Sequence, residues 1–247
     1  MRYLVTVEYF GKNYVGWQSQ TNGVAVQDVL NKALSELFNE DIRTEGSGRT
    51  DSGVHAVGQT AHFDSDRAFP LNRLPMAVNS ILPKDIRVKS ARIVPDDFHV
   101  RYSAKKKTYV YKMYVSRFIS PVRADTHVQV VPPVDVEIMK TALRDIVGTH
   151  DFKAFSATGS KITDNTVRTI YSAELREDGD EITLTVTGDG FLYNMVRIIV
   201  GTLVFIGKGK RPPTALRDMI ATGNRELGGK TFPAHGLYLD SVVYDEI

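Results

Sequence analysis

The sequence predicts an α+β protein built from two mixed halves around a shared cleft. Two observations support this: each half alternates strand-like and helix-like patterns of apolar residues, and a hairpin signal joins two of the strand patterns. The chain has 247 residues, 42% hydrophobic and 24% charged, which is enough to bury a substantial core. We expect the halves to be residues 1–104 and 105–247.

The first half should begin with a half-buried strand, because apolar side chains alternate along residues 2–9. An amphipathic helix is indicated over residues 26–38, where apolar residues recur at helical spacing. A second helix is expected over residues 71–82, with Pro75 in its first turns. The remaining expected elements are a loop over residues 10–23, a glycine-rich turn over 46–53, and strands over 59–63, 86–94 and 107–115.

The second half should start with a helix over residues 136–147, ended by Gly148. Asp178-Gly179 separates two strand patterns and therefore indicates a hairpin. Residues 191–206 form an apolar run that is too long for a typical strand, so we expect a buried helix. The other expected elements are the hairpin strands over 167–176 and 181–187, a short helix over 213–222 and a strand over 237–244.

Composition excludes several kinds of site. The chain has no cysteine, which rules out disulfides, thiolate metal sites and a cysteine nucleophile, and fits a cytoplasmic protein. No signal peptide and no membrane-spanning run is apparent. The net charge is only +2, so any case for a nucleic-acid partner depends on where the charges cluster.

The sharpest local feature is Gly48-Arg49-Thr50-Asp51-Ser52-Gly53-Val54-His55. Threonine, aspartate, serine and glycine commonly form turns, and that alone accounts for Asp51 and Gly53. It does not account for the presence of Arg49, Asp51 and His55 in a single turn. Loops on a rigid scaffold often carry reactive groups, so this segment is the first candidate for an active site.

This segment resembles the G-R-T-D-[AS]-G-V-H catalytic motif of the TruA-type tRNA pseudouridine synthases. Ser52 stands where many members carry alanine, a conservative departure. Four further blocks extend the resemblance over nearly the whole chain and in the right order. They are Tyr14-Val15-Gly16-Trp17-Gln18, Val94-Pro95-Asp96-Asp97-Phe98-His99-Val100-Arg101, Asn194-Met195-Val196-Arg197 and Gly236-Leu237-Tyr238-Leu239.

The resemblance implies the pseudouridine synthase fold, in which two mixed α/β halves with antiparallel-rich sheets flank a central basic cleft. It also implies an isomerase that needs no metal, nucleotide or other cofactor. Such an enzyme cuts the N-glycosidic bond of a uridine, turns the base and rejoins it to the ribose through C5. The resemblance also implies tRNA as the substrate, positions 38, 39 and 40 of the anticodon stem-loop as targets, and a homodimer. The active site would lie between the two halves.

By the same resemblance, Asp51 is the catalytic nucleophile, and it must be ionised, so a positive neighbour should hold its pKa low. Arg197 is the candidate neighbour, as the only charged residue of the apolar run 191–206. Alternatively, Arg197 is a solvated residue of an otherwise buried helix, or its long side chain reaches the solvent at the helix edge. A guanidinium among apolar neighbours is costly without a carboxylate, which favours the catalytic reading.

Tyr109 takes the position of the family tyrosine that stacks on the target base. From pattern alone, Tyr109 and Tyr111 are instead one packed face of a strand whose solvated start is Lys105 to Lys107. We assign Arg49, Lys208, Lys210 and Arg211 to contacts with tRNA phosphates, and His55 and Leu239 to substrate binding by the resemblance. The histidines lack the spacing of a metal site.

Two alternatives remain open. A non-catalytic RNA-binding protein could use the same basic residues, and an N-ribosyl hydrolase also needs a carboxylate near a glycosidic bond. The hydrolase would release free uracil, whereas the isomerase keeps the base attached.

Overall fold

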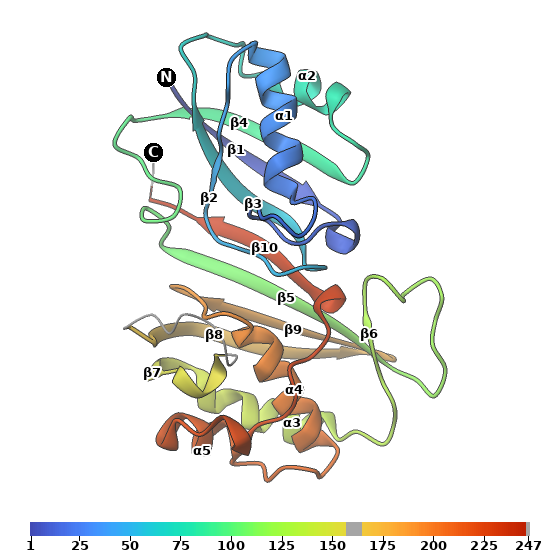
Figure 1. Ribbon diagram of the computed structural model, residues 1–247. Helices are drawn as coiled ribbons and strands as arrows, with labels where there is room; N and C mark the ends of the chain where they lie inside the picture. The colour runs from blue at the N-terminus through green and yellow to red at the C-terminus, as the bar shows by residue number, and fades with distance from the viewer. Residues whose placement is uncertain (157–164, 246–247) are drawn as a thin grey trace. The chain divides into compact units, whose positions relative to one another are not determined.

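Residues 1–156 and 165–245 are described by a computed structural model, in which the chain divides into two units. The first unit combines Met1–Lys105 with Tyr238–Ile247, and the second is Lys106–Leu237. The end of the chain therefore belongs to the unit that contains its beginning. Figure 1 shows the elements of each unit.

The sheet of the first unit is built around β1 (Arg2–Tyr9), which lies between β4 (Ile86–Val94) and β3 (His55–Asp64) and is antiparallel to both. On its other edge β3 pairs in parallel with β10 (Leu237–Val243). The short β2 (Glu45–Gly46) pairs antiparallel with β3. Because β3 has β1 on one side and β10 on the other, the segment that leads into β3 is held inside the sheet.

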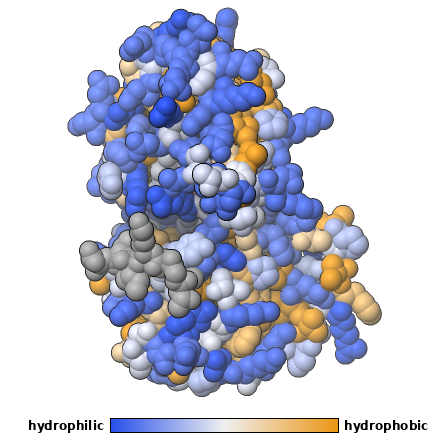
Figure 2. All heavy atoms as spheres, in the orientation of Figure 1, coloured by the Kyte–Doolittle hydropathy of each residue, from blue (hydrophilic) through white to orange (hydrophobic). Residues whose placement is uncertain are grey.

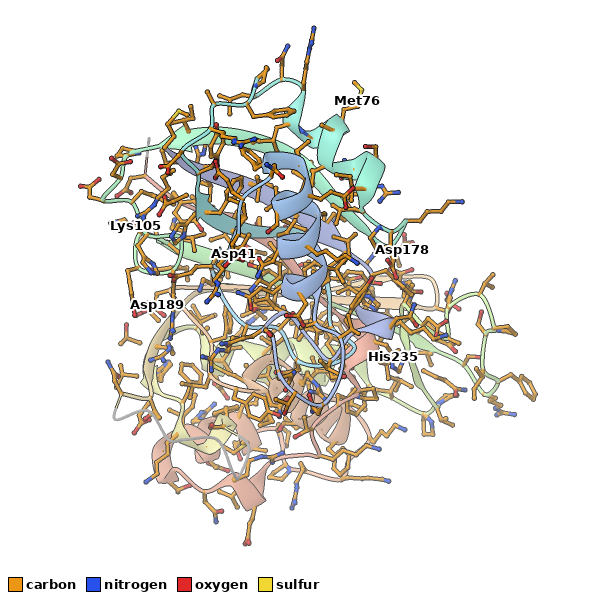
Figure 3. All side chains as sticks on the ribbon, turned by 45° about the horizontal axis from the view of Figure 1, so that its top comes forward. Asp41, Met76, Lys105, Asp178, Asp189 and His235 are labelled. Atoms are coloured by element: carbon orange, nitrogen blue, oxygen red, sulfur yellow. The ribbon has the colours of Figure 1, made fainter. Side chains whose placement is uncertain are left out.

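Helices α1 (Val26–Phe38) and α2 (Leu74–Ile81) lie next to each other over this sheet (Figure 1). The apolar stripe of α1 packs inward, and Phe38 sets its ring edge-on against Phe63 of β3, with 5.4 Å between centroids. The opposite side of α2 is solvated: Met76 is 77% exposed and points away from the sheet (Figure 3). Both helices are therefore amphipathic, as their residue spacing predicts.

In the second unit, β5 (Lys106–Val115), β9 (Glu181–Gly188), β8 (Val167–Asp178) and β7 (Gly148–Asp151) form an antiparallel series in that order. A short strand, β6 (Val128–Val130), pairs in parallel with β5. Each unit thus has a mixed, mainly antiparallel sheet with helices, and the predicted α+β class is confirmed.

The predicted hairpin joins β8 to β9 through Gly179 and Asp180. Asp178 pairs with Glu181, so the connection has two residues, and Gly179 has a φ of 60°. A glycine with positive φ at the first of two turn positions matches the twist of antiparallel strands.

Three helices, α3 (Val136–Leu143), α4 (Met195–Gly207) and α5 (Ala215–Thr222), gather beside the strands of the second unit (Figure 1). Almost the whole of α4 is buried; its two partly exposed residues are Arg197 and Phe205. The apolar run that predicted a buried helix therefore does form one.

Some boundaries differ from the prediction. The helix expected over residues 136–147 ends at Leu143 and continues as a 3-10 turn, Arg144–Ile146. Gly148 has a φ of 116° and opens β7, so the chain leaves helical geometry before the glycine. The helix expected from residue 191 starts at Met195, because Asn194 has a φ of 63°. The short strands β2, β6 and β7 were not predicted.

Candidate active site

Asp51 lies in a turn of the first unit, between β2 and β3. The backbone N–H of Val54 donates to the Asp51 carbonyl at 3.1 Å and closes the turn. Gly53 has a φ of 78°, a conformation that favours glycine. Asp51 itself is half-buried, so its carboxylate is partly withdrawn from solvent.

The preceding loop holds this turn in place. Trp17 donates its backbone N–H to the Thr50 carbonyl at 3.1 Å, and Gly53 donates to the Tyr14 carbonyl at 3.3 Å. Gly16 has a φ of 111°, and a Cβ there would overlap the Thr50 carbonyl oxygen. Only glycine permits this close approach, so the two backbone segments fix the position of Asp51 together.

Buried polar side chains support the same turn from the sheet. The hydroxyls of Tyr9 and Thr50 share a hydrogen bond of 2.7 Å. The Gln59 amide, fully buried in β3, donates to the Gly48 carbonyl at 2.8 Å and accepts from the Ser47 hydroxyl at 2.7 Å. Sequence reasoning missed Tyr9 and Gln59; the available signal for Gln59 was its place in an expected strand, since an amide that the strand buries needs partners.

His55 is a buried residue whose partners belong to the protein. Its Nδ1 accepts the backbone N–H of Gly11 at 2.9 Å, so that nitrogen carries no proton. Its ring stacks on Phe10 at 4.5 Å and contacts Tyr238 at 4.8 Å. The geometry is that of a residue that positions the surrounding loops, and the substrate contact stays a prediction.

Leu239 and Arg49 differ in setting. Leu239 is fully buried in β10 opposite Ala56 of β3, two residues after the turn ends. Arg49 is exposed next to the buried Thr50, and is thus available to a ligand in solution. Substrate contacts by these two residues also stay predictions.

Arg197 lies in the first turn of α4, in the second unit, and is half-buried. Its Nε donates to the Phe232 carbonyl at 2.7 Å, and its Nη1 donates to the Asn194 side-chain oxygen at 2.6 Å. The backbone N–H of Phe232 returns a bond to the Arg197 carbonyl at 3.1 Å. The guanidinium is therefore held in a defined orientation and is not a mobile surface group.

Tyr109 and Tyr111 share one face of β5, as alternate residues of a strand do. Tyr109 is 8% exposed, with the ring of Phe191 edge-on at 5.0 Å. Tyr111 is fully buried and donates its hydroxyl to the Pro233 carbonyl at 2.7 Å. Burial raises the pKa of Tyr111, against a lowering by the charge of Arg197. The structure thus brings Arg197 close to the tyrosine face of β5.

The basic residues assigned to phosphates fall into two groups. Arg211 uses its guanidinium on the backbone, donating to the carbonyls of Gly228 at 3.0 Å and Glu226 at 2.8 Å. Lys208 and Lys210, by contrast, line a hollow at the end of α4. All three assignments to tRNA stay predictions.

Within residues 1–156 and 165–245, no group of three or more histidine, aspartate or glutamate side chains could hold a metal ion. No helix of that part of the chain is long and apolar enough to span a membrane.

Comparison with known proteins decides the family. A family model described as tRNA pseudouridine synthase matches residues 5–103 and 142–245. A tRNA pseudouridine synthase A of Bacillus licheniformis is 46% identical over 247 residues, covering 99% of this chain and 100% of that protein. One from Thermoanaerobacter sp. is 44% identical over 241 residues, with 98% of both proteins covered. This chain belongs to the tRNA pseudouridine synthase family. The predictions of the family and of an isomerase are thereby confirmed.

A solved Cbf5–Nop10–Gar1 complex matches with a TM-score of 0.38 and 12% identity, covering 82% of this chain and 44% of that one.

In this tRNA pseudouridine synthase, separate sequence blocks that carry the resemblance meet in the first unit. The block at residues 14–18 contacts the turn at 48–55 through Gly16 and Trp17. The block at residues 236–239 reaches the same turn through Tyr238, which pairs with His55. Segments far apart in sequence therefore meet at the turn that carries Asp51.

Proposed function

We propose that this tRNA pseudouridine synthase isomerises the uridines at positions 38, 39 and 40 of the anticodon stem-loop, with Asp51 as its catalytic nucleophile. In the reaction the bond from C1′ of the ribose to N1 of uracil breaks and a bond from C1′ to C5 forms. The hydrogen on C5 leaves, and N1 gains one. Atoms and electrons balance without an oxidant, a reductant or a cofactor.

The rigidity of the Asp51 turn is the observation that carries the proposal. The turn is tied to the preceding loop at Tyr14 and Trp17 and to the sheet through Gln59. A carboxylate that is held before the substrate arrives loses little freedom on reacting, which lowers the barrier. An ordinary surface turn would not need buried polar supports on its backbone.

Arg197 is proposed to keep Asp51 ionised. Its Nε donates to the Phe232 carbonyl and its Nη1 to the Asn194 side-chain oxygen, which fixes the direction of the guanidinium. A half-buried guanidinium is stabilised by a carboxylate, and a carboxylate next to it keeps a low pKa. The motif of the first unit contributes the Asp51 carboxylate, and the second unit contributes the oriented Arg197 guanidinium.

Tyr109 is proposed to stack against the target base and to assist the movement of its proton. The Phe191 ring fixes the orientation of the Tyr109 ring. A fixed aromatic face is suited to receive a base that has left its stack.

The test is Asp51→Asn in an assay with tRNA tritiated at uridine C5. The variant keeps the shape of the side chain and loses its charge, so we expect tritium release to vanish while tRNA binding changes little, since backbone contacts supply most affinity. Near wild-type turnover by purified Asp51→Asn would contradict the assignment of Asp51 as the nucleophile.

Mapping the product of the wild-type protein tests the target positions and separates the alternatives. Pseudouridine at positions 38 to 40 in intact chains supports the proposal. Free uracil would indicate an N-ribosyl hydrolase, and tRNA binding with no change in the nucleoside would indicate an RNA-binding protein.

We also propose a homodimer that works in the cytoplasm. The loop after β5 carries exposed apolar side chains suited to a second copy: Phe118 is 81% exposed, Ile119 70% and Val122 91%. Figure 2 shows hydrophobic residues on this part of the second unit. Light scattering should give a dimer mass for the wild type and a monomer for Phe118→Asp/Val122→Asp; a monomeric wild type would contradict the proposal.

A further inference from the structure

A hollow of about 260 Å³ opens in the second unit beside the end of α4. Its walls come from α4, from β6 and from the segment that follows α5. The residues that matter for its chemistry are Lys208, Lys210, Lys230, Phe205 and Phe232. No residue of the motif at 48–55 and none of the proposed catalytic residues lines this hollow.

Three ammonium groups line it without a neutralising carboxylate. In residues 1–156 and 165–245, Lys208, Lys210 and Lys230 form no ion pair, and their side chains donate no hydrogen bond to protein. Burial lowers the pKa of Lys208, and the charges of Lys210 and Lys230 lower it further. Like charges that the fold holds together are stabilised by an anion.

The backbone holds these lysines close to one another. After α4 the chain folds back on the last turn: Lys208 donates its N–H to the Val204 carbonyl at 3.1 Å, and Lys210 donates to the Phe205 carbonyl at 2.8 Å. On the other side, the Lys230 carbonyl packs on Gly201, where a Cβ would overlap it. Lys230 can approach α4 only because residue 201 has no side chain.

Aromatic rings form the apolar part of the hollow. The Lys210 ammonium lies 5.8 Å from the Phe205 ring centroid, and the Lys230 ammonium lies 5.9 Å from that of Phe232. These distances fall within the range of cation–π attraction, so each ring lies beside one of the charges. A site with both features suits a ligand that carries an anion next to a sugar or a base. Its volume lies below that of sites for whole cofactors, roughly 300–1,000 Å³, and so suits a single nucleotide unit.

We infer that Lys208, Lys210 and Lys230 form a pocket that binds a backbone phosphate of the tRNA, with the adjoining nucleoside against Phe205 and Phe232. The inference depends on tRNA being the substrate. It adds Lys230 to the residues expected to contact RNA. Arg211, whose guanidinium is bound to backbone carbonyls, does not line this pocket. Lysine is well suited to bind phosphate as a point charge.

The test compares two triple variants with the same change in net charge. The pocket variant, Lys208→Gln/Lys210→Gln/Lys230→Gln, removes the three positive charges that line the pocket. The control variant, Lys32→Gln/Lys84→Gln/Lys153→Gln, removes three exposed positive charges elsewhere. The measurement is the Kd for tRNA as a function of salt between 50 and 200 mM, the range in which counterion release is readily seen. Thermal melts show whether both variants fold.

For the pocket variant we expect a Kd roughly ten times higher at low salt and a salt slope smaller by about one, as for loss of one phosphate contact. A pocket variant that matches the control variant in both Kd and slope would overturn the inference.

A second measurement distinguishes RNA phosphate from a free anion. Melts of the wild type in inorganic phosphate and in chloride of equal ionic strength show whether the pocket takes a small anion. If phosphate stabilises the wild type but not the pocket variant while tRNA binding is unchanged, the occupant is a small anion and the inference is wrong. Failure to modify positions 38 to 40 would instead contradict only the proposed targets, since the Kd values do not depend on the product.

Discussion

Replacing Gly16 with alanine tests the idea that the loop before α1 fixes the position of Asp51. Gly16 has a φ of 111°, and an added Cβ would overlap the Thr50 carbonyl oxygen while lying 3.1 Å from the Asp51 carbonyl carbon and 3.3 Å from the Ser52 nitrogen. The change therefore acts on the backbone of the catalytic turn and leaves the Asp51 side chain chemically intact.

The cost has two parts. A residue with a Cβ pays about 1–2 kcal/mol for a left-handed backbone conformation. Separating the two segments to relieve the overlap weakens the bond from Trp17 to Thr50, which adds about 1 kcal/mol. We therefore expect a loss of about 2–3 kcal/mol in the free energy of unfolding. Because the overlap must be relieved by moving backbone, Asp51 should shift by about 1 Å, a misplacement that costs about a hundredfold in rate.

The assay is tritium release from C5-labelled tRNA under single-turnover conditions, with a thermal melt of the same preparation. Gly223→Ala is the matched control, since Gly223 has a φ of 67° and no atom lies within 4 Å of the added Cβ. The control should lose about 1 kcal/mol of stability and keep its rate. If Gly16→Ala reacts within twofold of Gly223→Ala, the loop does not position Asp51 and the reasoning is refuted.

Tyr109→Phe should lose roughly a hundredfold in single-turnover rate while the Kd for tRNA changes little, because the ring remains and the hydroxyl is lost; collapsed binding with normal turnover would make Tyr109 a recognition residue. Arg197→Met should fold but lose activity, and part of the activity should return at higher pH as Asp51 ionises. Arg197→Lys should retain more activity than Arg197→Met, and pH–rate profiles of both variants measure this. Burial lowers the pKa of His62, and Arg2 lowers it further. As the pH falls, His62 is therefore protonated in the unfolded chain before it is protonated in the folded chain. Stability should therefore be full above about pH 6.5 and fall as the pH drops below it. His62→Gln should reduce this slope in melts between pH 7 and 5; an unchanged slope would show that His62 does not contribute.

The sequence by itself determined most elements and the family. Period-two alternation placed β1, and helical spacing placed α1, because both patterns come from local backbone geometry. The long apolar run predicted the burial of α4, since such a run has no solvated face. The motif around Asp51, with its companion blocks, led to the family that the comparisons confirm.

Only the tertiary structure decided which distant segments meet. Tyr238 pairs with His55 and so joins the end of the chain to the first unit, a contact that no local period encodes. Local sequence does not distinguish Gly16 from an ordinary loop glycine, and only the fold places the Thr50 carbonyl against it. Likewise, Lys230 joins Lys208 and Lys210 because the segment that carries it packs on Gly201 of α4. Residue periodicity records whether a side chain is buried, whereas its partner depends on the packing of the whole unit.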